Sequence, residues 1–172
     1  MRFFFDTEFL EDGQTITLLS IGIVNDKGDA FYAINGECDQ TLANPWVVKH
    51  VLPYLHTPEG PTLSLPEIRA AVLRFMGAKP KEIWAYNGAY DWVVLCQLFG
   101  PMVALPEGWP TYHLDIKQWR DHINRPKLPK QTTRKHHALN DALWVKDSWH
   151  FLKDLQAQAA LLTIDHTTKT ST

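Results

Sequence analysis

The first 34 residues contain three runs rich in β-branched and aromatic residues, separated by two short turn sequences. The runs cover 2–6, 15–24 and 31–34, and the two turns contain Gly13 and Gly28. Asp-Gly and Lys-Gly pairs between such runs favour hairpins. The sequence therefore predicts three consecutive antiparallel strands at the start of the chain.

Beyond residue 45 the pattern changes to helical periodicity interrupted by short strands. Helices are expected over 45–55 (broken by a proline), 64–76, 89–99, 118–123 and 138–162, and strands over 82–86 and 112–116. This order predicts an α/β fold with a mixed central sheet flanked by helices. We expect a single domain over 1–162, followed by a polar, flexible tail over 163–172.

Four carboxylates lie where the apolar pattern faces the core. Asp6 and Glu8 share one face of the first strand, because side chains alternate along a strand. Asp91 and Asp141 each open a helical pattern and lie on its apolar stripe. Either aspartate taken alone would more often be a helix N-cap. Buried carboxylates are costly unless they are paired or bind a cation, so the four together indicate a divalent metal site.

Three motifs contain these acids. They are Asp6-Thr7-Glu8, then Asn87 to Asp91, then His136 to Asp141, in which a histidine precedes the aspartate by five positions. In this order they resemble the motifs of the DEDD exonucleases in their histidine version, DEDDh. The stretches 4–13 and 84–98 are most similar to the RNase AS type, small actinobacterial 3′–5′ exoribonucleases that favour polyadenylate. The resemblance extends over about 1–162.

The resemblance implies an RNase H-like fold and a metal-dependent 3′–5′ exoribonuclease. Its substrate would be single-stranded RNA, its products nucleoside 5′-monophosphates, and its cofactor two Mg²⁺ or Mn²⁺ ions. The implied metal ligands are Asp6, Glu8, Asp91 and Asp141, with His136 as the general base. The implied contacts to the terminal nucleotide are Thr7, Phe9 and Leu10, and a homodimer is also implied. Trp92 is a further substrate-binding candidate, because it follows Asp91 and bases stack on aromatic faces.

The third motif contains two adjacent histidines. His136 and His137 precede Asp141 by five and four positions, and the spacing favours His136 as the base. His137 would then contact phosphate or lie on the surface.

The net charge of −2 provides no overall attraction to nucleic acid, so any such binding must be local. A segment without acids between His122 and Asn140 provides local positive charge, which predicts salt-sensitive binding of a phosphate backbone. Its basic residues are Arg125, Lys127, Lys130, Arg134 and Lys135. The alternative is that this basic segment is a solvent-exposed loop that does not bind nucleic acid.

Two cysteines favour free thiols in a reducing cytoplasm, and no apolar run approaches the length of a membrane span. Three other functions are alternatives to this one. A DNA exonuclease or proofreading subunit would share all three motifs. A catalytically silent nucleic-acid-binding protein would have lost an acid or the base, and none is lost here. A structural calcium site would need closely spaced acids, whereas these are scattered over more than a hundred residues.

Overall fold

The computed structural model describes residues 1–169, with side chains up to residue 161. Its strands are β1 (Arg2–Glu11), β2 (Ile16–Asn25), β3 (Ala30–Asn35), β4 (Thr62–Leu63), β5 (Glu82–Ala85) and β6 (Leu114–Asp115). Its α-helices are α1 (Pro45–His50), α2 (Leu65–Met76), α3 (Ala89–Gln97), α4 (Ile116–His122) and α5 (Ala138–Lys169). Three short 3₁₀ helices are η1 (Gln40–Leu42), η2 (Leu52–Tyr54) and η3 (Met102–Ala104).

The sheet has the order β4-β3-β2-β1-β5-β6, with β1 near its centre. β1, β2 and β3 are antiparallel neighbours, whereas β5 runs parallel to β1 and β6 parallel to β5. The prediction of a mixed sheet that begins with three antiparallel strands is therefore confirmed. β1 is longer than the expected 2–6, because its pairing with β2 continues through Glu11 after a register shift at Glu8/Phe9.

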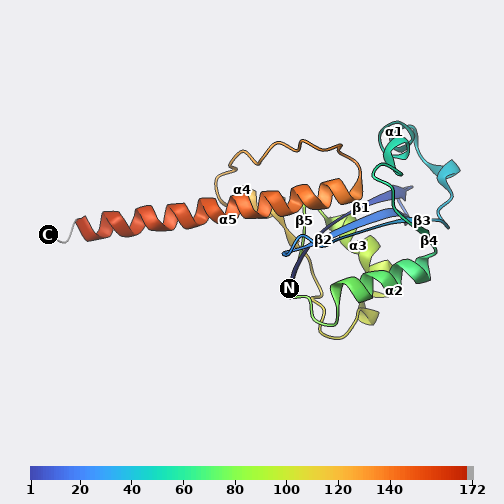
Figure 1. The fold of residues 1–172 in the computed structure, drawn as a ribbon, viewed down its shortest axis with the longest axis horizontal. Helices are drawn as coiled ribbons and strands as arrows, with labels where there is room; N and C mark the ends of the chain where they lie inside the picture. The colour runs from blue at the N-terminus through green and yellow to red at the C-terminus, as the bar shows by residue number, and fades with distance from the viewer. Residues whose placement is uncertain (170–172) are drawn as a thin grey trace.

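Alternation along β1 divides the core into two layers. Phe3 and Phe5 pack on the face covered by α2 and α3, whereas Phe4 packs on the opposite face against α5. Figure 1 shows α5 and α2 on opposite sides of the sheet. Because both faces of β1 are covered, the polar residues that follow Phe5 on this strand also lie inside the molecule.

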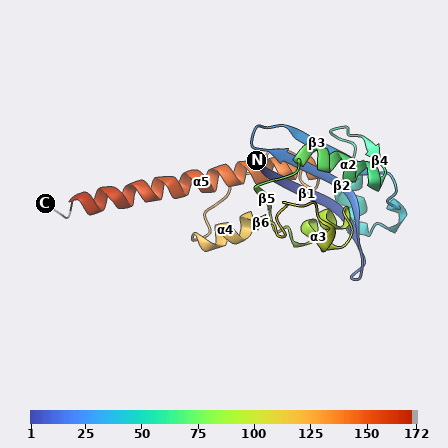
Figure 2. The ribbon, with the colours of Figure 1, turned by 90° about the horizontal axis from the view of Figure 1, so that it is seen from below.

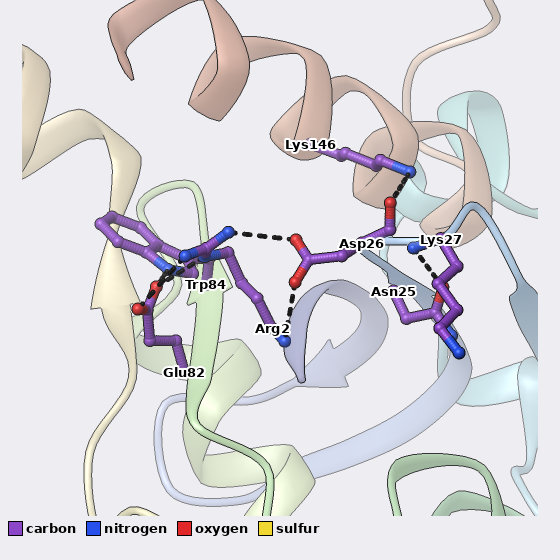
Figure 3. Close-up of polar contacts among 7 residues, drawn as sticks. All are labelled: Arg2, Asn25, Asp26, Lys27, Glu82, Trp84 and Lys146. Atoms are coloured by element: carbon purple, nitrogen blue, oxygen red, sulfur yellow. Dashed lines mark hydrogen bonds and ion pairs between the residues drawn. The ribbon is translucent and has the colours of Figure 1, made fainter. Parts of the chain in front are cut away.

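A polar cluster joins the beginning of β1 to three other elements (Figure 3). The Arg2 guanidinium contacts Glu82 of β5 at 2.6 Å and Asp26 of the β2–β3 turn at 3.1 Å. Lys146 of α5 donates to the Asp26 carbonyl oxygen at 3.2 Å, and the Trp84 indole donates to Glu82 at 2.7 Å. These contacts fix the register of β1 against β5 and the position of α5 over the sheet.

Gly22 lets α5 begin directly on the sheet. It is the β2 partner of Asp6, so both residues face α5. A Cβ at Gly22 would lie 2.3 Å from the Leu139 nitrogen and 2.4 Å from the Ala138 carbonyl carbon. The first turn of α5 therefore lies beside Asp6 only because this position has no side chain.

The second half of α5 projects away from the body of the molecule (Figures 1 and 2). The helix continues to Lys169, beyond the predicted end at 162, because no glycine or proline interrupts it. Most of the expected tail over 163–172 is thus helical, and 170–172 lie outside the described residues. No helix in the described part of the chain is long and apolar enough to cross a membrane.

Replacing Gly22 with alanine is expected to lower the free energy of unfolding by about 1–3 kcal/mol, the usual cost of overpacking. Urea denaturation measures the change. Thr17→Ala, at an exposed position of the same strand, is the control and should change stability by about 0.5 kcal/mol or less. A Gly22→Ala protein as stable as the wild type would contradict this packing of α5.

Candidate active site

One cavity brings together residues from the three motifs. Asp6, Glu8, Asp91, His136 and Asp141 all line it. They come from the middle of β1, the first turn of α3, and the segment that enters α5. Residues far apart in the sequence thus meet on one side of β1.

Asp91 reaches this cavity because one edge of β1 is open. The pairing of β1 with β5 ends at Phe4↔Trp84, so the Thr7 amide has no partner strand. Asp91 accepts a hydrogen bond from the Thr7 amide at 2.9 Å and one from the Thr7 hydroxyl at 2.7 Å. The carboxylate therefore replaces a strand at this edge and lies next to Asp6 and Glu8.

Asp115 fixes the turn that leads from β5 into α3. The Gly88 amide donates to Asp115 at 2.9 Å, and a Cβ at Gly88 would lie 2.3 Å from the Ala85 Cβ. Burial opposes the charge of Asp115, but hydrogen bonds from His113 and from the Gly88 and Gln118 backbone lower its pKa to about 2. A charged Asp115 thus holds the turn, and the turn holds Asp91.

Asp141 is held by the chain that precedes α5. The His136 amide donates to one carboxylate oxygen at 2.9 Å, and the Gln131 side-chain amide donates to the other. His136 has a φ of 61°, in the left-handed region, which turns the chain into the helix. Ligand atoms of Glu8, His136 and Asp141 all lie within 4.8 Å of one another.

The charged forms of the four carboxylates are electrostatically unfavourable in this structure. Burial, followed by repulsion from Asp91, Glu8 and Asp141, raises the pKa of Asp6 well above its usual value. Burial and repulsion also raise the pKa of Glu8 to about 8. Burial raises the pKa of Asp91 and Asp141 as well, although their hydrogen bonds oppose it.

No Lys or Arg within residues 1–161 forms an ion pair with any of these four. Buried oxygen ligands without a basic partner are the donor set that Mg²⁺ and Mn²⁺ prefer. The residues present therefore fit a divalent cation site.

The two histidines of the third motif occupy different environments. His136 lines the cavity, and its ring packs edge-on against Trp46 at 4.8 Å. Burial lowers its pKa, although the nearby Asp141 opposes this. His137 is only 1% exposed and packs on the Tyr32 ring at 4.5 Å, so it is neither on the surface nor in the cavity.

The residues expected to contact the substrate are divided between the cavity and the core. Thr7 and Phe9 line the cavity. Leu10 packs instead in the apolar cluster beneath α1, and Trp92 packs edge-on against Phe5 in the core. Trp92 follows Asp91 in a helix, where consecutive side chains point about 100° apart, and at this position the turn directs the side chain into the core. The Leu10 and Trp92 side chains thus contribute to the core rather than to the cavity wall.

Three aromatic residues that the sequence analysis did not single out line the same cavity: Trp46, Tyr86 and Tyr90. Trp46 is 50% exposed and Tyr90 is 56% exposed, and Tyr90 contacts the Phe9 ring at 5.7 Å. Tyr90 lies inside the second motif, where its position beside Asp91 was a usable signal. Trp46 stands at the start of a short helix with no such signal.

A second cavity of about 580 Å³ adjoins the first and shares Asp6, His136 and Asp141 with it. Its basic lining residues are Arg120, Lys127, Lys130 and Lys135. Arg125 instead faces Asp121 at 3.5 Å, and the Arg134 guanidinium lies over the Tyr54 ring. Part of the predicted basic segment therefore borders the acid cluster, and part of it makes other contacts.

The chain is similar in sequence to known 3′–5′ exoribonucleases. The family described as the 3′–5′ exoribonuclease Rv2179c-like domain matches residues 1–153. The 3′–5′ exoribonucleases Rv2179c and MT2234.1, from the H37Rv and CDC 1551 strains of Mycobacterium tuberculosis, are each 45% identical to this chain over 146 residues. Each match covers 83% of this chain and 87% of the relative.

Solved structures with little sequence identity share the fold. Exonuclease I matches with a TM-score of 0.59 at 14% identity, over 84% of this chain and 39% of its own. A chain from the yeast NOT1 MIF4G–CAF1 co-crystal matches with a TM-score of 0.52 at 12% identity, over 91% of this chain and 80% of its own. The fold is RNase H-like, as expected. Together with the family match and the 45% identity, this shows that the chain belongs to the Rv2179c-like 3′–5′ exoribonuclease family.

Proposed function

We propose that this protein is a metal-dependent 3′–5′ exoribonuclease that hydrolyses single-stranded RNA to nucleoside 5′-monophosphates. The observation that carries the proposal is the group of four buried or partly buried carboxylates that have raised pKa values and no basic partner, beside a histidine of lowered pKa. A cluster of this kind is unfavourable for stability alone, which indicates that it is retained for binding cations.

Asp6, Glu8, Asp91 and Asp141 would hold two Mg²⁺ or Mn²⁺ ions. When bound, such ions make water nucleophilic and compensate the charge on the leaving oxygen. Gln131 and the His136 amide keep the Asp141 carboxylate in one orientation, and Thr7 does the same for Asp91. The chain thus pre-orients its ligands through neighbouring donors.

His136 is the proposed general base. Its ring lies in the cavity with Glu8 and Asp141, and its lowered pKa keeps it neutral at pH 7. A neutral imidazole can accept a proton from the attacking water.

The two adjoining cavities suggest how the RNA lies. The aromatic cavity, with Phe9, Tyr90 and Trp46, suits the terminal nucleotide, because bases stack on aromatic faces. The basic cavity, with Lys127 and Lys130, suits the phosphates of the upstream nucleotides. A paired end must first be separated, at a cost of a few kcal/mol, so single strands are favoured. We also propose a preference for adenine-rich 3′ ends, because the family that the chain resembles favours polyadenylate.

The projecting part of α5 supports a homodimer. Leu161 on it is 65% exposed, and an exposed apolar side chain there suits packing against a second copy of the chain. The free buried thiols of Cys38 and Cys96 fit a reducing compartment, so we also propose a cytoplasmic location.

Product analysis with 5′-end-labelled oligonucleotides tests the function and its main alternative, DNA exonuclease activity. RNA and DNA of matched sequence are incubated with Mg²⁺ or Mn²⁺, alongside poly(A), poly(U) and blunt duplexes. We expect the 5′-labelled single-stranded RNA to shorten progressively from its 3′ end, with unlabelled mononucleotides as the other product, and poly(A) to be degraded faster than poly(U). Equal rates on RNA and DNA would contradict the RNA assignment, and faster cleavage of blunt duplex would contradict the proposed cavity for the terminal nucleotide.

His136→Ala should lower kcat by roughly 10²–10⁴-fold, the usual contribution of a positioned base. In the wild type, the acidic limb of the pH–rate profile should lie below 6.5, because the pKa of His136 is lowered. His137→Ala is the matched control. It should reduce stability more than rate, because His137 is buried against Tyr32. The opposite pattern would move the base to His137.

Without metal, the protein should become less stable as the pH rises. The folded state keeps the Glu8 proton up to a pKa of about 8, whereas the unfolded state loses it near 4.5. The folded state thus binds more protons between these values, so its stability falls across this window as pH rises. Thermal melts in chelator from pH 5 to 8 should show a shallower fall for Glu8→Gln than for the wild type. Parallel curves would contradict a protonated Glu8.

Replacing Lys127 and Lys130 together with glutamine should raise KM for RNA more than it lowers kcat. The slope of log KM against log salt should decrease by roughly 0.7 for each lost phosphate contact. Lys27→Gln removes an exposed charge in the β2–β3 turn and is the matched control. An unchanged slope in the double variant would mean that the two lysines do not contact phosphate.

A further inference from the structure

The connection between α4 and α5 carries His136 and has no helix or strand of its own. It runs back along α5 to the first turn of that helix (Figure 1). Side-chain contacts must therefore fix its position. Gln131 donates to Asp141, and the Asn140 side chain donates to the Arg134 carbonyl oxygen at 3.2 Å. These two contacts attach the connection to α5 on one side.

Arg134 attaches the same connection to a different element on its other side. Its guanidinium carbon lies 3.7 Å from the centroid of the Tyr54 ring, in the geometry of a cation–π contact. Tyr54 belongs to η2, which follows α1 directly. The residue thus joins α5, through its backbone, to η2, through its side chain.

The same α1–η2 unit also contacts the ring of His136. Trp46 packs on that ring at 4.8 Å, and His50 lies 6.4 Å from it. Between the two contacts lies a hollow of about 500 Å³ that Tyr54 and His136 both line. The Arg134–Tyr54 contact therefore determines how far α1 and η2 stand from the chain that presents His136.

The backbone at His136 needs this support. Its φ of 61° is uncommon for a residue other than glycine, and such conformations persist only when surrounding contacts hold them. Arg134 is two residues away, and its side chain contacts Tyr54 of η2. Without that contact the connection would keep its bonds to α5 through Gln131 and Asn140, but it would lose its attachment to η2 through Arg134.

We infer that Arg134 and Tyr54 form a clamp that positions His136, and that Arg134 is a positioning residue rather than a phosphate contact. The inference rests on the proposed function for its kinetic part. The inference gives Arg134 a different role from Lys127, Lys130 and Lys135. These three lysines line the basic cavity, and Arg134 does not.

Kinetics of five variants separate the two roles of Arg134. Tyr54→Leu and Arg134→Met should each lower kcat about fivefold, the population change that a contact of this class supports, with KM and its salt slope unchanged. The double variant should be no slower than either single variant, because the two residues act as one contact. Tyr54→Phe keeps the aromatic face and should restore the rate, whereas Lys130→Gln should change KM and the salt slope. If Arg134→Met behaves like Lys130→Gln while Tyr54→Leu resembles the wild type, the inference is wrong.

A spectroscopic measurement tests the clamp without any RNA. The imidazole proton signals of His136, assigned by their loss in His136→Gln, report the ring current of Trp46. They should shift in Tyr54→Leu and in Arg134→Met, and stay in place in Tyr54→Phe and Lys130→Gln. Unchanged signals in the first two variants would overturn the clamp. Because this readout needs no turnover, a protein that fails to hydrolyse RNA would contradict the proposed function and leave the clamp testable.

Discussion

Mutual repulsion among four buried or partly buried carboxylates is the constraint on which the rest of this structure depends. Asp6 and Glu8 stand in the middle of a central strand, where burial and neighbouring charge raise their pKa values. Nothing in the described side chains neutralises them by an ion pair. The surrounding fold keeps Asp91 and Asp141 close to them all the same, through hydrogen bonds from Thr7 and from the chain before α5.

Several distant features serve this one arrangement. Gly22 removes a side chain so that the first turn of α5 can lie beside Asp6. The early end of β5 opens the edge of β1 to Asp91, and Asp115 holds the turn between them. Each feature would be unnecessary in a fold that only had to bury its sheet. Together they explain why the sheet and the site cannot be considered separately.

The sequence predicted the layers of the fold and the acidic cluster, because both depend on local periodicity. Alternation placed Asp6 and Glu8 on one face, and helical spacing placed Asp91 on an inward stripe. Adjacency in sequence was an inconsistent guide to the cavity wall: Phe9 and Tyr90 adjoin site residues and line the cavity, whereas Trp92 adjoins Asp91 and lies in the core. Trp46 was missed because its place in the wall depends on how α1 packs against His136, a long-range contact that no local pattern encodes.

Calorimetric titration of Mn²⁺ into the protein tests the central claim most directly. Because the carboxylates have raised pKa values, cations can bind only by displacing protons. Titrations at pH 7 in two buffers of different ionisation enthalpy should give saturable binding of two ions, and the observed enthalpy should differ between the buffers because they take up the released protons. Asp6→Asn should lose this binding. An absence of saturable Mn²⁺ binding to the wild type, or equal binding by Asp6→Asn, would contradict a metal site built on these acids.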